Sequence, residues 1–195
     1  IQTVLGQPPL LAASAANAGQ FVVSGALNAF LPLYARDVVG LTAPEVGALF
    51  AAQTVATLAM RPVVGRASDR LGRRALIIGG LVLCGVTVWL LPLAGSGLAL
   101  AAGLVVYAAG VAATAMAFTA FVTDVTSRAT YGAAHGVFGT IYDIGDALGP
   151  LGAGVVVAAA GYPAMFRTAA TLALAMALLF AVVSTISAAV STTSA

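Results

Sequence analysis

The sequence predicts an all-α, polytopic membrane protein with six transmembrane helices, and three observations support this prediction. Hydrophobic residues make up 61% of the 195 residues, whereas charged residues make up only 7%. An average soluble domain carries roughly 25% charged residues, so a soluble fold of this size could not cover its surface. Six apolar stretches approach the length of about 20 residues that a helix needs to cross a bilayer. Finally, the arginines gather on one side of the resulting topology.

Each predicted helix is an apolar stretch, and short polar breaks separate one helix from the next. The expected helices cover residues 10–34, 46–64, 75–93, 98–122, 133–160 and 164–186. Together they predict one six-helix bundle over residues 10–186. We expect a lead-in or linker over residues 1–9 and a polar C-terminal tail over residues 187–195.

The eight arginines orient the predicted bundle. Six of them fall on one side, and two, Arg36 and Arg167, fall on the other. By the positive-inside rule, the side with more arginines faces the cytoplasm. An even number of spans then places both termini in the cytoplasm, and we expect a multi-pass protein of the cell (inner) membrane. The six arginines are Arg61, Arg66, Arg70, Arg73, Arg74 and Arg128.

Composition and motifs argue against several other classes of protein. A net charge of +2 is too small and too localised to indicate nucleic-acid binding. The single cysteine, Cys84, excludes an intramolecular disulfide. The sequence shows no cluster of metal ligands, no glycine-rich phosphate loop ahead of a lysine and no nucleophile paired with a base. We therefore expect no cofactor, no metal and no catalytic residues.

The segment between the second and third predicted helices has a physical reason for each residue type. Gly65 allows a neighbouring helix to approach closely. Asp69 can accept backbone N–H bonds and complement the positive end of a helix dipole. Gly72 can take the positive φ of a tight turn, and the arginines hold the segment at the anionic cytoplasmic leaflet. A plain positive-inside loop would need arginines but not this spacing.

This segment resembles the signature loop of the major facilitator superfamily, whose pattern is Gly-x-x-x-Asp-Arg-x-Gly-Arg-Arg. It also follows the second helix of a six-helix half, as in that family. The resemblance implies a secondary active transporter that works by alternating access. In such a protein this loop latches the cytoplasmic gate through charge and dipole contacts with the other half. The matching residues are Gly65, Asp69, Arg70, Gly72, Arg73 and Arg74.

Two segments indicate which half of such a transporter this chain resembles. The fourth predicted helix lacks the arginine that N-terminal halves often carry, and residues 142–150 look like the eleventh helix of the family. Residues 145–154 also resemble the fifth-helix pattern of drug/proton antiporters, with one glycine replaced by alanine. We favour the C-terminal half. The resemblance implies a second six-helix half, supplied by a missing N-terminal portion, a partner chain or a second copy.

Two acidic residues, Asp143 and Asp146, lie well inside the fifth predicted helix. Asp143 is about 15 Å along that helix, where an ionised aspartate costs about 2.5–3.5 kcal/mol. Pro150 cannot donate to the carbonyl of residue 146, so we expect a helix kink and a free carbonyl there. We predict that at least one of the acids lines a proton or substrate pathway. A structural acid, bonded to a Ser, Thr or Tyr of an adjacent helix, is the alternative.

Asn28 and Gln53 are polar residues inside the first and second predicted helices, which often face the cavity in the resembling family. They can contact a substrate or form interhelical hydrogen bonds. The expected partners are a small organic solute, protons and membrane lipids, and we favour proton-coupled efflux. The alternatives are a sugar or metabolite importer of the same family and a non-transporting six-helix subunit of a larger complex.

Overall fold

The computed structural model describes residues 8–125 and 131–193. Within these two ranges, all regular structure is helical. Most of the expected lead-in over residues 1–9 lies outside the described residues. The elements are α2 (Pro8–Asp37), α3 (Ala43–Leu71), α4 (Arg73–Leu90), the short 3-10 helix η1 (Leu91–Leu93), α5 (Gly97–Val125) and α6 (Tyr131–Thr193).

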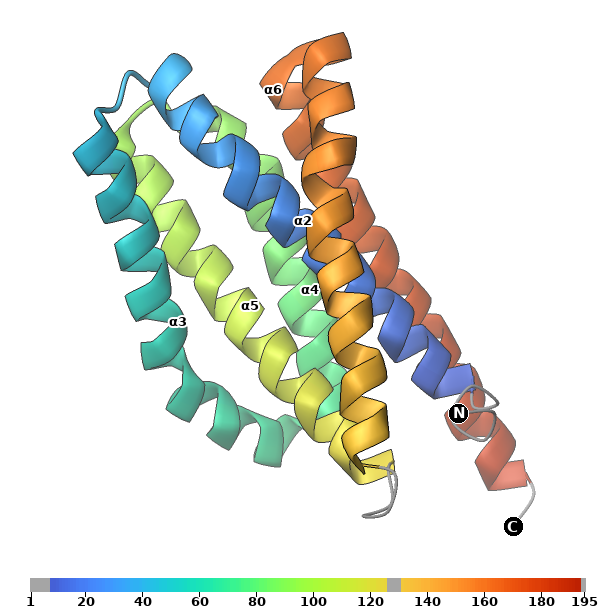
Figure 1. Cartoon of the computed structure of the whole chain (residues 1–195). Helices are drawn as coiled ribbons and strands as arrows, with labels where there is room; N and C mark the ends of the chain where they lie inside the picture. The colour runs from blue at the N-terminus through green and yellow to red at the C-terminus, as the bar shows by residue number, and fades with distance from the viewer. Residues whose placement is uncertain (1–7, 126–130, 194–195) are drawn as a thin grey trace.

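The longest element, α6, consists of two helices. Gly161 interrupts it with φ 78° and ψ 177°, a conformation that is essentially restricted to glycine. The two arms, residues 131–160 and 162–193, run in opposite directions (Figure 1, orange and red), and residues of both arms line one apolar cavity. The described chain therefore forms six long helices, which follow the six predicted apolar stretches in order.

Four helical segments of the described chain are long and apolar enough to cross a membrane. They confirm the all-α, polytopic membrane class. The last segment is 45 residues long and includes both arms of α6. The helix α2 is not among the segments found in the described residues, so six crossings stay a prediction. The four segments are Ala43–Ser68, Arg73–Leu93, Gly97–Phe121 and Tyr142–Ile186.

The helix termini fall at two opposite ends of the bundle. The end at the bottom of Figure 1 carries the start of α2, the junction between α3 and α4, and the end of α6. The other end carries the connection between α2 and α3, η1 and the turn at Gly161. This arrangement puts Arg70 and Arg73 at the end opposite to Arg36 and Arg167, as the predicted topology requires.

The helices pack through close crossings. The helix α2 lies against α6, α3 lies on α5, and α4 contacts both α5 and α6. A Cβ added to Gly145 of α6 would lie 2.8 Å from the carbonyl oxygen of Ala18 on α2. One added to Gly80 of α4 would lie 2.9 Å from the carbonyl oxygen of Gly110 on α5. Small residues thus bring the backbones together, and in lipid such packing contacts are a main force between helices.

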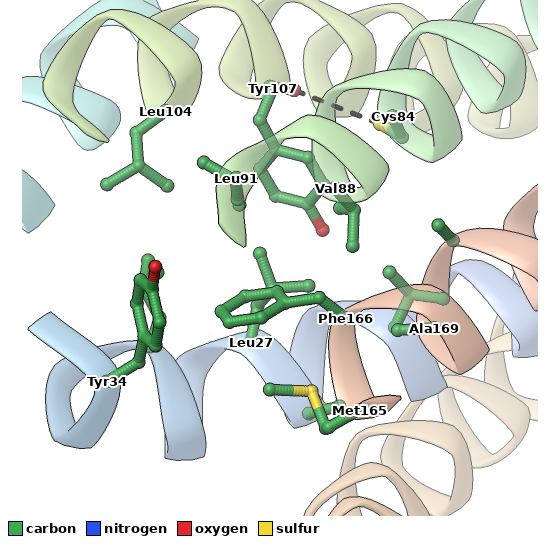
Figure 2. Close-up of a cluster of buried hydrophobic side chains, with 14 of the residues drawn as sticks. Leu27, Tyr34, Cys84, Val88, Leu91, Leu104, Tyr107, Met165, Phe166 and Ala169 are labelled. Carbon is green, nitrogen blue, oxygen red and sulfur yellow. Dashed lines mark hydrogen bonds between the residues drawn. The ribbon is translucent and has the colours of Figure 1, made fainter. Parts of the chain in front are cut away.

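A buried apolar cluster joins the helices toward the end that carries Gly161. Figure 2 shows Leu27 and Tyr34 of α2 beside Phe166 of α6, with Leu91 and other side chains facing them. Phe166 is fully buried, and its ring meets the ring of Tyr34 edge to face at 5.0 Å between centroids. These contacts hold α2 and the second arm of α6 together as one packed unit.

Two local features concern Pro150 and the C-terminal segment. Helical dihedral angles continue through Pro150, and a non-helical residue interrupts α6 at Gly161. The kink expected at Pro150 stays a prediction. A membrane helix tolerates a proline in this way when a neighbouring helix packs on the carbonyl that loses its partner. At the C-terminus, α6 continues to Thr193, so most of the segment 187–195 that we expected as a polar tail is helical.

Candidate functional site

The arginine-rich segment contains a junction of one residue. The helix α3 continues to Leu71 and α4 begins at Arg73, so only Gly72 separates them. Gly72 has φ 80° and ψ 155°, a region of backbone conformation that is essentially reserved for glycine. The positive φ expected at this position is therefore present. Because no further loop residues intervene, Gly72 alone sets the direction of α4 relative to α3.

The last two arginines of the motif bind the chain itself. Arg73 donates from its guanidinium group to the carbonyl oxygen of Ala120 on α5. Arg74 donates to the carbonyl oxygen of Ser184 on the second arm of α6, at 3.1 Å. These charge-assisted hydrogen bonds tie the start of α4 to two other helices. The bonded residues are 47 and 110 positions apart in the sequence, so no local pattern could predict them.

The other motif residues lie on α3. Arg70 and Arg66 are exposed and have no hydrogen-bond or ion-pair partner among the described residues. Both line a groove of about 390 Å³. A Cβ added to Gly65 would lie 3.6 Å from Met116 Cε, an ordinary contact, so packing within this chain does not require glycine there. Asp69 belongs to α3, but its side chain is outside the described part of the chain.

The two intramembrane acids lie on the first arm of α6. Asp143 is exposed and Asp146 is half-buried. A structural acid would need a hydrogen bond from a Ser, Thr or Tyr. Neither carboxylate has such a bond among the described residues. Beside them, the ring of Tyr142 meets the ring of Phe21 on α2 at 4.0 Å between centroids. Ring contacts therefore hold this arm against α2, while the carboxylate of Asp143 stays exposed.

The backbone next to Asp146 packs directly on α2. Because Pro150 has no N–H, the carbonyl of Asp146 lacks its usual helical donor. That oxygen lies against Gly25 of α2. It occupies the space that a Cβ on residue 25 would need. A Cβ added to Gly149 would likewise lie 2.7 Å from the backbone nitrogen of Ala26. The carbonyl that we expected to be free for a ligand is thus covered by α2.

Asn28 and Gln53 have different environments. Asn28 is exposed on α2, and Gln53 is half-buried on α3. The Oε1 atom of Gln53 is buried and has no hydrogen-bond partner in the described chain. Thr54 and Thr57, by contrast, each donate to a carbonyl oxygen one turn earlier in α3, at 2.9 Å. Lipid offers no hydrogen bonds to an exposed amide such as that of Asn28.

Sequence reasoning missed a polar cluster at the centre of the bundle. Gln20 of α2 donates to the Cys84 sulfur of α4 at 3.5 Å. Ser24 of α2 shares a 2.9 Å hydrogen bond with the Tyr107 hydroxyl of α5. Cys84 also donates to the carbonyl oxygen of Tyr107 at 3.8 Å (Figure 2). The available signal was the spacing of Gln20 and Ser24, which are four residues apart and therefore share a helix face.

Two tyrosines connect neighbouring helices at the end of the bundle opposite to Gly72. Tyr162 donates to the carboxylate of Asp37 at 2.9 Å, which joins the end of α2 to the second arm of α6. Tyr34 donates to the carbonyl oxygen of Pro92 at 3.1 Å, and its ring packs on the ring of Tyr162. Both ends of the bundle are thus cross-braced within the chain.

Comparison with known proteins relates this architecture to a family. The sequence profile of the Major Facilitator Superfamily matches residues 13–194. An uncharacterized MFS-type transporter of Burkholderia mallei (strain SAVP1) is 37% identical over 67 residues, as is one of Burkholderia pseudomallei (strain K96243). The uncharacterized MFS-type transporter YhhS of Escherichia coli (strain K12) is 37% identical over 68 residues.

The matched segments cover 34–35% of this chain and only 16–17% of the length of these relatives. The family profile, in contrast, covers nearly the whole described chain. It agrees with the apolar helical spans and with the motif around Gly72. The chain belongs to the major facilitator superfamily.

Proposed function

We propose that this chain forms one six-helix half, the C-terminal one, of a secondary active transporter that moves a small organic solute by alternating access. The main support for the proposal is that the rest of the chain buries very little of α3. Only 6% of the apolar window of Ala43–Ser68 is buried, against 50% for Arg73–Leu93. A membrane helix that bears the family motif and is so bare offers a surface for a second half to cover.

Polar groups on membrane helices support a second half and a cavity between the two. Asn28 and Asp143 are exposed on helices of the bundle. Such groups face a water-filled cavity or another protein surface, because lipid cannot solvate them. We therefore place the solute pathway along the face that bears them. A missing N-terminal portion, a partner chain or a second copy would supply the second half.

The gating role in this proposal belongs to the junction between α3 and α4. Arg73 and Arg74 fasten the junction to α5 and α6, so the motif moves as one body with this half. Asp69 and Arg70 are then the motif charges that contact the second half when the cytoplasmic side closes. Because the junction is fixed to this half, it moves together with the half during the rocking motion.

Proton coupling is proposed for the acids of α6. The neutral form of an aspartic acid avoids most of the cost of a charge within the membrane, so Asp143 or Asp146 can take up a proton there. Uptake of a proton as the solute leaves corresponds to efflux by antiport. An importer of a sugar or metabolite would use the same helices, and transport measurements decide between the two directions.

The proposed orientation places the end with Gly72, and both termini, in the cytoplasm of a cell whose inner membrane holds the protein. Its basis is the positive-inside rule. Arg66, Arg70 and Arg73 lie at this end of the bundle, and Arg36 lies at the other. Arg128, which adds to the same count in the sequence, is outside the described residues.

Transport by the purified full-length protein in liposomes tests the proposal. Asp143→Asn and Asp146→Asn each remove one titratable group at nearly constant size. With ethidium as the export probe and glucose as the import probe, we expect ethidium export to drive proton movement, read by a pH-sensitive dye. At least one of the two variants should abolish that movement. Asp37→Asn is the matched control, because Asp37 lies at the end of α2, outside the proposed pathway.

Each outcome of this experiment has a defined meaning. Unchanged coupling in both variants contradicts the proton role of the acids. Glucose uptake without ethidium export assigns the protein to the importers. A folded protein that moves neither probe, nor any member of a broad solute panel, favours the non-transporting subunit.

A further inference from the structure

The four arginines around Gly72 divide into two pairs. Arg73 and Arg74 are occupied within the chain, where both bind backbone carbonyl oxygens. Arg66 and Arg70 are exposed and bind no residue that the structure describes. They are four positions apart on one helix, where like charges repel. An anion placed between their two guanidinium groups would remove this repulsion.

Arg66 and Arg70 line a groove along the last turns of α3. The groove has a volume of about 390 Å³, and its other walls are Val63, Ala67 and Leu71. Val63 is 54% exposed and Leu71 is 68% exposed. The spacing of the five residues puts them on one face of the helix. The groove thus combines two cationic groups with apolar walls.

The groove lies where a membrane span ends. The apolar span of α3 ends at Ser68, so Arg66 belongs to its last turn and Arg70 lies just beyond it. Side chains at this depth meet phospholipid headgroups and the first carbons of the acyl chains. Guanidinium groups suit the former, and exposed side chains such as Val63 suit the latter.

We propose that this groove is a binding site for the phosphate of an anionic phospholipid. Guanidinium groups bind phosphate oxygens through paired, charge-assisted hydrogen bonds. Basic pockets beside the cytoplasmic ends of membrane helices bind anionic headgroups for this reason. Asp69 contributes a single carboxylate next to Arg70 in the sequence, and two arginines leave an excess of positive charge over it.

The lipid site goes beyond the proposed transport function, and it requires the membrane and a second half that leaves the groove open. One consequence does rest on that function, because the lipid phosphate and the second half would compete for the guanidinium group of Arg70. Bound lipid would then favour the state in which the cytoplasmic side is open. Lipid binding is measured without transport, so failure of this site and failure of the proposed function are distinguishable.

Native mass spectrometry of the purified full-length protein in detergent tests the site. Dioleoyl phosphatidylglycerol is the anionic probe, and dioleoyl phosphatidylcholine is the zwitterionic one. We expect one phosphatidylglycerol to bind in preference to phosphatidylcholine. Arg66→Gln and Arg70→Gln should each weaken its binding about fivefold, and the double variant should lose the preference. The charge-conserving variants Arg66→Lys and Arg70→Lys should retain most of it.

Arg61→Gln is the matched control, because Arg61 is an exposed arginine of the same helix outside the groove. Its preference for phosphatidylglycerol should be that of the wild type. Thermal unfolding verifies that every variant compared is folded.

Four results overturn the proposal. In the first, the wild type shows no preference, as it would if the second half covered the groove. In the second, the double variant keeps the preference. In the third, Arg61→Gln loses it equally, which would indicate non-specific attraction to a charged surface. Displacement of the lipid by millimolar inorganic phosphate would overturn the lipid as the source of the anion.

Discussion

Among single residues, Gly72 and Gly161 each form a one-residue turn between two helices. Gly72 has φ 80° and ψ 155°, and Gly161 has φ 78° and ψ 177°. Each stands alone between two long helices, so no neighbouring loop residue can take over the change of direction. These two positions are therefore expected to tolerate a side chain less well than glycines within the helices.

Gly72→Ala should destabilise the protein by about 1–3 kcal/mol, the usual cost of holding a residue other than glycine in this region. The measurement is the midpoint of thermal unfolding in detergent. Gly65→Ala is the matched control, because it adds the same methyl group seven residues earlier, 3.6 Å from Met116 Cε and in a helical conformation. Equal shifts of the midpoint in the two variants would contradict the strain argument.

Among the helices, the crossing of α2 and the first arm of α6 depends on direct backbone contact. Gly25 of α2 and Gly149 of α6 each lie against the backbone of the partner helix. A side chain at either position would have to push the helices apart, and the Tyr142–Phe21 ring contact nearby would be lost with them. The acids of the first arm are therefore positioned by residues that have no side chain.

Gly149→Leu should cost about 3 kcal/mol or more, because overpacking a close crossing displaces the backbone. Gly152→Leu is its control on the same arm, since no other atom lies within 4 Å of a Cβ added there. The readout is the yield of folded protein on size-exclusion chromatography, together with the unfolding midpoint. A loss of folded Gly152→Leu as large as that of Gly149→Leu would argue against this crossing.

The six helices were predictable because hydropathy acts locally, so each apolar stretch reveals the helix that contains it. The length of their connections was not. We expected polar breaks at residues 65–74 and 161–163, whereas the helices continue to within one residue of each other. Hydropathy indicates where the apolar span ends and not where the helix ends. The helix α3, for example, continues to Leu71, beyond the end of its apolar span at Ser68.

The candidate site was predictable in its residue types but not in its contacts. The missing N–H of Pro150 predicts a carbonyl without its helical donor at Asp146, and only the packed structure shows Gly25 next to that oxygen. The motif likewise marked Arg73 as important, but its bond to the carbonyl of Ala120 depends on how α4 packs on α5. Contacts between distant segments follow from the packing of whole helices, which one sequence does not reveal.

At the scale of the whole molecule, the described chain covers some helices well and leaves others bare. Half of the apolar window of Arg73–Leu93 is buried, whereas α3 is almost uncovered. Exposed residues of the bundle are therefore of two kinds, those that face lipid and those proposed to face a wet pathway. Leu178, on the second arm of α6, represents the first kind, and Asn28 represents the second.

Asn28→Cys and Asp143→Cys should react with a hydrophilic maleimide when the full-length protein is in membranes, because the proposed pathway contains water. Leu178→Cys should stay unlabelled, although Leu178 is 66% exposed in this chain, because lipid excludes the reagent. The native Cys84 is fully buried and should contribute no background. Labelling of Leu178→Cys as fast as Asn28→Cys would contradict a wet pathway on the Asn28 face.

The turn at Gly161 also constrains how the protein is made. A single residue joins the two arms of α6. The connection is therefore too short for one arm to cross the bilayer while the other stays outside it. If both arms cross the membrane, we expect them to enter it together as a helical hairpin. Residues 38–42, which connect α2 to α3, leave enough chain for those two helices to be inserted one after the other.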